Sequence, residues 1–490
     1  MRPNGLQKAI ILALSALLFL YSLYLYWRTD AERIGPVELS PLKERQTLLW
    51  RQLHSLLEGH APKCPSPERQ DSSGAIGFNA LEGATRPDLI INADHIEQPM
   101  QEAHDAFVYA IKNSNLNRAY SRGTSGIVSS AGKSYLPLFV TSLRMLRRTG
   151  STLPVELFVK DASEYEIKIC EDILPEYNAK CIILSDILAG QGKSMVEIAH
   201  YQIKIFAVLF SSFENVIWMD SDGFPLYKPE TLLQAEPFTA TGLVTWPDFW
   251  ASTASPLYYN ISRQPVPPMT ERASSETGVF LISKNTHFLT MLLAAYYNYY
   301  GPSHYFMLLS QGGPGEGDKE TFIQAAAAIS EPFYTVSERV SAIGHEKPEG
   351  GISGSAMVQA DPIEDYRLTS EGKWRVKNQS VAKAPRVFFV HAHYPKFNPA
   401  ENLFGNEWET APTLKQDGSL GRAWVVPEET LRRFGYDAEK GYWEEIKWVS
   451  CSLEHVFESW KGKSGICHRV EEYWRNVFDN PEEDVPTFSD

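Results

Sequence analysis

The stretch GIVSSAGKSYLPLFVTSLRMLRRTGSTLPVELFV, residues 126–159, decides the fold. Its first seven residues are small or apolar and predict a buried strand that ends in a turn at Gly132. Apolar residues then recur at helical spacing from Tyr135 to Arg148, and VELFV predicts a second strand over 155–159. Strand, glycine turn, helix and strand make a βαβ unit, the usual way to connect two parallel strands.

The same alternation continues along the chain. Helices are predicted over 164–174 and 196–213, and strands over 181–184 and 215–219. We therefore expect an α/β fold with a largely parallel, Rossmann-like sheet. Ligands of such sheets bind beyond the carboxyl ends of the strands, so functional residues are expected there.

Two aspartates separated by one residue, Asp220 and Asp222, follow the apolar strand NVIWM. Such a pair can present oxygens to one divalent cation, and that cation can bridge diphosphate oxygens. The alternative is a turn in which the aspartates cap backbone N–H groups. The position at a strand's carboxyl end favours the metal site.

Two other phosphate-handling motifs do not fit. G-K-S occurs at 132–134 and 192–194, but the glycine that a P-loop needs five positions earlier is replaced by Ile127 and Ile187. A dehalogenase-like phosphatase is excluded because Phe224 stands two residues after the aspartate pair, where that motif has Thr or Val.

Two later segments also carry polar groups. The glycine-rich run LSQGGPGEGDKE brings Glu316, Asp318 and Glu320 to the start of an alanine-rich helix, where negative charge is stabilised. These carboxylates offer acid/base or hydroxyl-binding groups for a sugar, although a capped loop is the simpler interpretation. The predicted strand RVFFV runs into His391, which could complete the metal site, and into Lys396, which could neutralise a diphosphate. Surface histidines and a solvated lysine are the alternative.

Composition excludes a disordered chain and disfavours a nucleic-acid-binding protein. The chain of 490 residues is 43% hydrophobic, which excludes wholesale disorder. It has 46 Lys and Arg against 60 Asp and Glu, a net charge of −14, so nucleic acid is not an expected partner. An acidic protein that handles an anionic ligand needs a cation where the two meet.

The N-terminal segment predicts a membrane anchor. Residues 9–27 are uncharged, nearly long enough to cross a core of about 30 Å, and end in Tyr26 and Trp27, as at a membrane interface. A cleaved signal peptide is the alternative. Arg2 and Lys8 precede the span, which predicts a cytosolic amino end and a single-pass type II protein.

An oxidising lumen would allow disulfides between cysteines that are close in sequence. Cys170 with Cys181 and Cys451 with Cys467 are the candidates, and Cys64 is left over. Five reduced, buried cysteines remain the alternative.

Four segments, taken together, resemble one known family. They are VIWMDSDGFPLYKPETL (216–232), ERASSETGVFLISK (271–284), YYNYYGPSHYFMLLSQGGPGEGDKETF (296–322) and VHAHYPKFNP (390–399). In this order they resemble the fungal Golgi α-mannosyltransferases of mannan and N-glycan outer-chain synthesis, and most closely the α-1,2 subgroup. Gly223 departs from the pattern, since the family has Asn there.

The resemblance implies a GT-A glycosyltransferase fold, GDP-mannose as donor, Mn2+ as cofactor and a mannose residue of mannan or an N-glycan as acceptor. It assigns Asp220, Asp222 and His391 to the metal, and Glu276 and Asp318 to catalysis beside the donor sugar and acceptor. Residues for nucleotide-sugar binding are Gly132, Lys204, Asp220 and Lys396. Alternatives are an α-1,3-mannosyltransferase, a UDP-sugar transferase on the same fold, or a non-catalytic subunit of a Golgi mannosyltransferase complex.

The expected organisation is a cytosolic tail over 1–8, a signal-anchor helix over 9–27, a stem and linker over 28–118, and a luminal GT-A domain with a C-terminal extension over 119–490. Within the stem, an amphipathic helix is expected over 42–58 and a linker rich in Pro, Ser and Gly over 61–87. The protein is expected in the Golgi membrane, alone or as an oligomer with other mannosyltransferases.

Overall fold

A computed structural model describes residues 42–189, 197–347, 350–405, 411–480 and 485–488. The anchor predicted over 9–27 and the tail before it lie outside these ranges. Within them, no helix has both the length and the apolar character needed to cross a bilayer.

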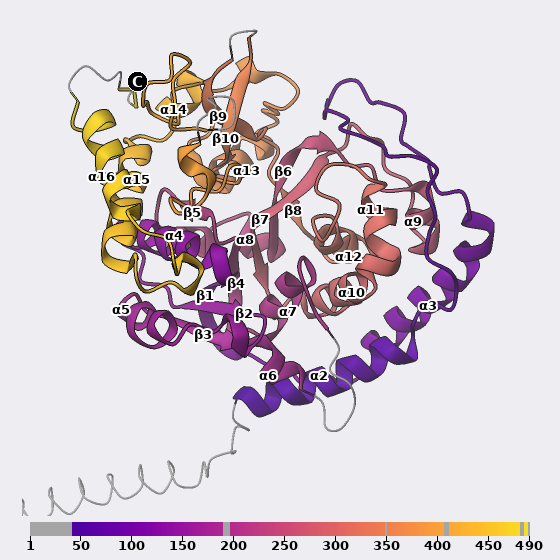
Figure 1. Ribbon diagram of the computed structural model, residues 1–490. Helices are drawn as coiled ribbons and strands as arrows, with labels where there is room; N and C mark the ends of the chain where they lie inside the picture. The colour runs from indigo at the N-terminus through magenta and orange to yellow at the C-terminus, as the bar shows by residue number, and fades with distance from the viewer. Residues whose placement is uncertain (1–41, 190–196, 348–349, 406–410, 481–484, 489–490) are drawn as a thin grey trace, which may run out of the picture.

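A seven-stranded sheet in the order β3-β2-β1-β4-β7-β6-β8 forms the centre of the molecule (Figure 1). The strands are β1 (Ser121–Ser130), β2 (Val155–Val159), β3 (Ala179–Ile183), β4 (Phe213–Met219), β6 (Leu243–Ala251), β7 (Ala273–Ser283) and β8 (Tyr334–Thr335). β3, β2, β1 and β4 are parallel neighbours, whereas β7 is antiparallel to both β4 and β6. The predicted α/β fold with a mostly parallel sheet is confirmed.

Helices cover both faces of this sheet, and the side chains along a central strand point alternately into two apolar cores. Val216 and Trp218 of β4 belong to one core, with α7 (Gln202–Phe210) and α10 (Phe288–Tyr299). Ile217 and Met219 belong to the other, with α4 (Leu136–Arg148). Period-two alternation on a strand buried on both faces explains why NVIWM is almost wholly apolar.

A second, antiparallel sheet continues directly from the aspartate pair. Its order is β5-β11-β10-β9, with β5 (Gly223–Pro225), β11 (Val387–His391), β10 (Ile352–Ala360) and β9 (Ser341–Glu346). β5 starts immediately after Asp222, and its Gly223 is paired with His391 of β11. This register carries the histidine to the aspartates across a long sequence separation.

Two predicted helices differ in their bounds. The helix expected over 196–213 is α7, which ends at Phe210 because Phe213 already starts β4. The helix expected over 164–174 is a π-helical segment, Lys168–Ile173, followed by one turn of α5 (Leu174–Glu176). Other helices of the described residues are α6 (Leu184–Leu188), α8 (Phe238–Thr241), α9 (Pro256–Ile261), α11 (Phe306–Ser310), α12 (Thr321–Ile329), α13 (Pro362–Ser370) and α14 (Glu428–Arg432).

The segment expected to be a stem packs against the domain from residue 42 onward. α2 (Leu42–Gly59) and α3 (Ala93–Asn113) run along one side of the molecule (Figure 1). Leu49, Leu53 and Leu57 of α2 are all 0% exposed, inside the same core as α7 and α10. The amphipathic helix expected over 42–58 therefore packs its apolar face against the domain.

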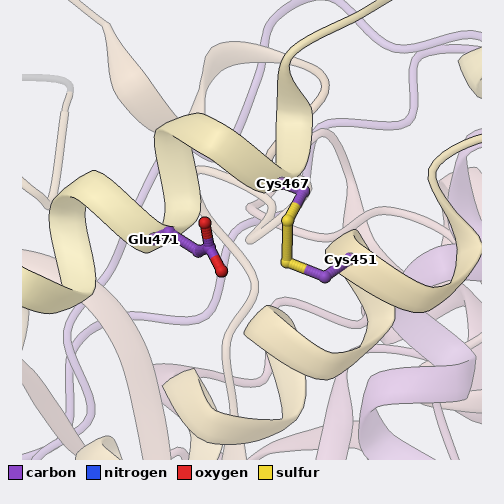
Figure 2. Close-up of side chains that lie close together, drawn as sticks. All are labelled: Cys451, Cys467 and Glu471. Carbon is purple, nitrogen blue, oxygen red and sulfur yellow. A yellow bond between two sulfur atoms is a disulfide. The ribbon is translucent and has the colours of Figure 1, made fainter.

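Both predicted disulfides are confirmed, Cys170–Cys181 and Cys451–Cys467. The second joins α15 (Ala438–Leu453) to α16 (Ile466–Val477), with Glu471 beside it (Figure 2). Because both sulfurs are used in the disulfide, this acidic neighbour does not make a metal site. Cys64 is half-buried and free.

Candidate active site

The aspartate pair lies at the carboxyl end of β4, as the sequence predicted. Asp222 is buried, and Asp220 is partly exposed. The backbone N–H of Asp220 donates to the carbonyl of Gly278 on β7 (2.8 Å), and Gly223 N–H donates to the carbonyl of Asp220 (3.0 Å). These backbone hydrogen bonds hold the pair on a tight turn.

His391 joins the two aspartates. One ligand atom from each of Asp220, Asp222 and His391 can be chosen so that all lie within 4.8 Å of one another. Carboxylate oxygens with an imidazole nitrogen form a donor set that suits a divalent cation such as manganese. The group predicted as metal ligands is therefore assembled in a geometry that fits such an ion.

His391 is held between two carboxylates. Its Nε2 lies 3.1 Å from Oδ1 of Asp222, and its Nδ1 lies 3.5 Å from Oε1 of Glu276 on β7. Burial lowers the pKa of His391, but the two carboxylates outweigh it and raise this pKa well above its usual value. A carboxylate facing the second ring nitrogen is a common way of orienting a metal-binding histidine.

A glycine makes room for this arrangement. A Cβ atom on Gly278 would lie 2.6 Å from Nδ1 of His391 and 2.8 Å from Oε1 of Glu276. Any side chain at this position would have to push these two groups apart. Glu276 also stabilises this part of β7, because its Oε1 accepts the N–H of Gly278 (2.6 Å).

Lys204, in the first turn of α7, connects Asp220 to the glycine-rich loop. Its Nζ lies 3.2 Å from Oδ1 of Asp220 and 3.4 Å from Oδ2 of Asp318, and donates to the carbonyl of Thr277 (2.7 Å). Burial lowers the pKa of Lys204, but Asp220 and Asp318 outweigh it and raise this pKa. Lys204 is therefore a buried cation that holds two acidic groups together.

Lys396 forms an ion pair with Asp222, and its Nζ lies 5.6 Å from the ring centre of Tyr135. Burial raises the pKa of Asp222, but His391 and Lys396 outweigh it, and this pKa lies well below its usual value. Asp222 is thus anionic. The side chain of Lys396 remains 33% exposed, so its ammonium group can reach an anion in solution.

Of the three carboxylates in the glycine-rich loop, only Asp318 reaches the site. It is 4% exposed, and burial raises its pKa to about 6 although Lys204 opposes the shift. Glu320 pairs with Arg272 (2.9 Å), and Glu316 pairs with Arg69 (2.9 Å). These two carboxylates stabilise the loop instead.

Gly132 lies at the carboxyl end of β1, next to β4, but its nearest side chain is not in the acidic cluster. A Cβ atom there would lie 2.4 Å from Oε2 of Glu164. The sequence also failed to single out Trp218, whose Nε1 donates to Oδ1 of Asp220 (2.8 Å). Its place two residues before Asp220 on a strand, hence on the same face, was the available signal.

The mostly parallel α/β sheet, with an Asp-x-Asp pair at its carboxyl edge and a histidine brought beside it, is the arrangement predicted for the GT-A fold. Comparison with known proteins agrees with this class. Residues 124–273 and 269–361 match a protein family described as "Mannosyltransferase putative".

Named relatives make the family specific. Alpha-1,2-mannosyltransferase MNN21 of Candida albicans is 34% identical over 77% of this chain and 65% of its own length. Alpha-1,2-mannosyltransferase MNN2 of Saccharomyces cerevisiae is 33% identical over 68% of this chain and 65% of its own length. The chain is similar to these fungal mannosyltransferases over most of its length, and it spans slightly less than two thirds of the length of these relatives.

Among solved structures, galactosyltransferase LgtC in complex with donor and acceptor sugar analogs is similar over 69% of this chain and 100% of that chain. The identity is 12% and the TM-score 0.35.

Proposed function

We propose that this protein is a retaining α-mannosyltransferase that transfers mannose from GDP-mannose to mannose residues of mannan or N-glycan outer chains, forming α-1,2 linkages. The observation that carries the proposal is the grouping of Asp220, Asp222 and His391 at the carboxyl edge of the sheet. The relatives named as α-1,2-mannosyltransferases support the sugar and the linkage.

The donor set of Asp220, Asp222 and His391 supports Mn2+ as the cofactor. When bound, a divalent cation neutralises diphosphate oxygens and so makes GDP a better leaving group. Glu276 keeps the His391 ring in place through its contact with Nδ1.

Two lysines serve the donor diphosphate and the site around it. Lys396 is partly exposed and paired with Asp222, so it can exchange this contact for a phosphate oxygen and stabilise charge that develops on the leaving group. Lys204 is buried and keeps Asp220 and Asp318 at a fixed separation. Fixed groups of this kind stabilise a transition state without reorganising during the reaction.

Donor and product are both α-linked in the proposed reaction, so configuration is retained. Retention needs either a covalent intermediate on a carboxylate or front-face attack, in which the leaving phosphate accepts the proton of the acceptor hydroxyl. We favour front-face attack, with Asp318 orienting that hydroxyl. Asp318 is suited to this role because it is buried beside Lys204 and Asp220, at the start of a loop-to-helix junction.

We place the protein in the Golgi membrane as a single-pass type II protein, anchored through residues 9–27, with the domain in the lumen. Two disulfides support an oxidising compartment. The asparagines of the two N-glycosylation sequons, Asn260 and Asn378, are both exposed. Association with other mannosyltransferases of the same membrane is part of this proposal.

The test is a donor panel. The full chain, purified in detergent, is incubated with Mn2+ and GDP-mannose, UDP-galactose or UDP-N-acetylglucosamine, with and without α-mannobiose. We expect nucleotide release from GDP-mannose only, stimulated by the acceptor and lost on chelation, and an α-1,2-linked product by NMR. Release from a UDP-sugar, an α-1,3 product, or no turnover of any donor would each contradict the proposal.

A further inference from the structure

The segment between α2 and α3 is bound to the loop that carries Asp318. We call residues 66–91 the strap and residues 310–320 the Asp318 loop. The strap passes α9 and α11 on its way between the two N-terminal helices (Figure 1). Its ends pair with each other through an antiparallel bridge between Arg69 and Ile90, so it is a closed loop and not a free linker.

Backbone contacts fix the first half of the Asp318 loop to the strap. The N–H of Ser73 donates to the carbonyl of Gln311 (2.8 Å), and the hydroxyl of Ser72 donates to the carbonyl of Gly312 (2.7 Å). A Cβ atom on Gly312 would lie 2.2 Å from Nη1 of Arg69. The glycine-rich sequence of the loop therefore lets the strap lie directly on its backbone.

An ion pair reaches closer to Asp318. Nη1 of Arg69 lies 2.9 Å from Oε2 of Glu316, and the same oxygen accepts the N–H of Gly312 (2.5 Å). Arg69 thus fixes a carboxylate that folds back on the loop two residues before Asp318.

A buried amide locks the base of the loop. Gln311 is 0% exposed, and its Nε2 donates to the carbonyls of Pro87 (2.9 Å) and Thr253 (2.7 Å). Its Oε1 accepts the N–H of Leu89 (2.8 Å). All three hydrogen bonds of the Gln311 side chain form only when the strap is in place, because Pro87 and Leu89 supply two of the partners.

The strap also contacts the strand on the other side of the loop. The N–H of Phe78 donates to the carbonyl of Phe249 (3.1 Å), next to Asp248 on β6. Asp248 in turn lies 3.1 Å from Nζ of Lys319, the neighbour of Asp318. Both walls beside Asp318 are thus tied to the same N-terminal segment.

We propose that the strap positions the Asp318 loop for the acceptor, with Arg69 and Gln311 as positioning residues. The inference rests on the proposed function, since Asp318 is there the residue that orients the acceptor hydroxyl. A group in this role must be held within a fraction of an ångström, and the Asp318 loop has neither strand nor helix of its own over residues 311–320 to do so. The segment expected as a linker is thereby assigned a part in the transfer reaction.

The test compares transfer with donor hydrolysis, in which water replaces the sugar acceptor. Arg69→Ala is expected to lower kcat/KM for α-mannobiose by about tenfold or more. It should leave hydrolysis of GDP-mannose and the KM for the donor near wild-type values. Arg69→Lys, which keeps the charge, should restore part of the transfer rate.

The matched control is Arg263→Ala. Arg263 pairs with Asp105 (2.7 Å), and this also ties an N-terminal helix to the domain but touches no part of the Asp318 loop. Arg263→Ala should behave as wild type. If Arg69→Ala leaves transfer unchanged, or lowers transfer and hydrolysis equally, the strap does not position the acceptor side.

Hydrogen exchange separates this inference from the proposed function. Amides of residues 306–320 should exchange faster in Arg69→Ala than in wild type or Arg263→Ala. Unchanged exchange overturns the strap inference whatever the enzyme turns over. Absence of turnover with every donor in the wild type overturns the proposed function, while the exchange result still decides whether the strap holds the loop.

Discussion

Nδ1 of His391 lies 3.5 Å from Oε1 of Glu276, while the other ring nitrogen faces Asp222. The imidazole is therefore flanked by two carboxylates, one from β7 and one from the turn between β4 and β5. This pair explains why the strand β7 carries a glycine at residue 278, where a side chain would enter the contact.

Gly278→Ala should damage the site without unfolding the protein. The new Cβ would lie 2.6 Å from Nδ1 of His391, so the ring must leave its position between Asp222 and Glu276. We expect Mn2+ affinity, measured by calorimetry, to fall by about 10–100-fold. Gly223→Ala is the control, because its Cβ would meet nothing closer than 3.4 Å. Equal metal binding by the two variants would show that the His391–Glu276 contact has no role in holding the metal.

Asp318→Asn should lower transfer to α-mannobiose by about 10²–10³-fold if its charge orients the acceptor. Asn keeps the size of the side chain and can still contact Lys204, which limits structural effects. Asp220→Ala should abolish both transfer and donor hydrolysis. Near-normal turnover by Asp318→Asn, with Asp220→Ala inactive, would refute the proposed role of Asp318.

Leu53→Ala should destabilise the domain although it lies in the segment expected to be a stem. Leu53 is 0% exposed, and truncation of a buried leucine costs about 2–5 kcal/mol. Leu48 on the same helix is 43% exposed, so Leu48→Ala should change the free energy of unfolding by only about 0.5 kcal/mol. Urea unfolding of the two variants measures the difference. Equal stabilities would mean that α2 is not part of the folded domain.

His104 on α3 should make the protein less stable in acid. Burial lowers the pKa of His104 to about 4, with Asp105 opposing the shift, and its Nε2 lies 2.8 Å from the hydroxyl of Tyr297. The unfolded chain takes up this proton near pH 6.5 and the folded protein only near pH 4, so stability falls as pH drops through this interval.

His104→Gln, which keeps a polar group for Tyr297, should therefore show a smaller fall of Tm between pH 7 and about 4.5. Replacement of the exposed His455 by Gln serves as the control and should follow the wild-type curve. An unchanged pH dependence in His104→Gln would exclude His104 as the source of acid sensitivity.

Local patterns in the sequence determined the sheet and the aspartate pair. The strand VELFV is observed over Val155–Val159 as predicted, and Asp220 and Asp222 follow β4 as predicted, because strand formation and its end depend on nearby residues. Both disulfides could also be predicted from the sequence, since the paired cysteines are only 11 and 16 residues apart. The strand RVFFV and the glycine-rich run singled out His391 and Asp318 as candidates, and the family resemblance assigned their roles.

Only the tertiary structure decided which polar groups meet. His391 is 169 residues from Asp222 in sequence, and the pairing of β11 with β5 is what joins them. Glu316, Asp318 and Glu320 look equivalent in the sequence, yet two of them are neutralised by arginines from distant segments and one faces Lys204. The contacts of the strap were likewise decided by the tertiary structure. Its hydrophilic, proline-containing sequence is that of a linker, and its hydrogen bonds exist only because the folded domain presents unpaired carbonyl groups to it.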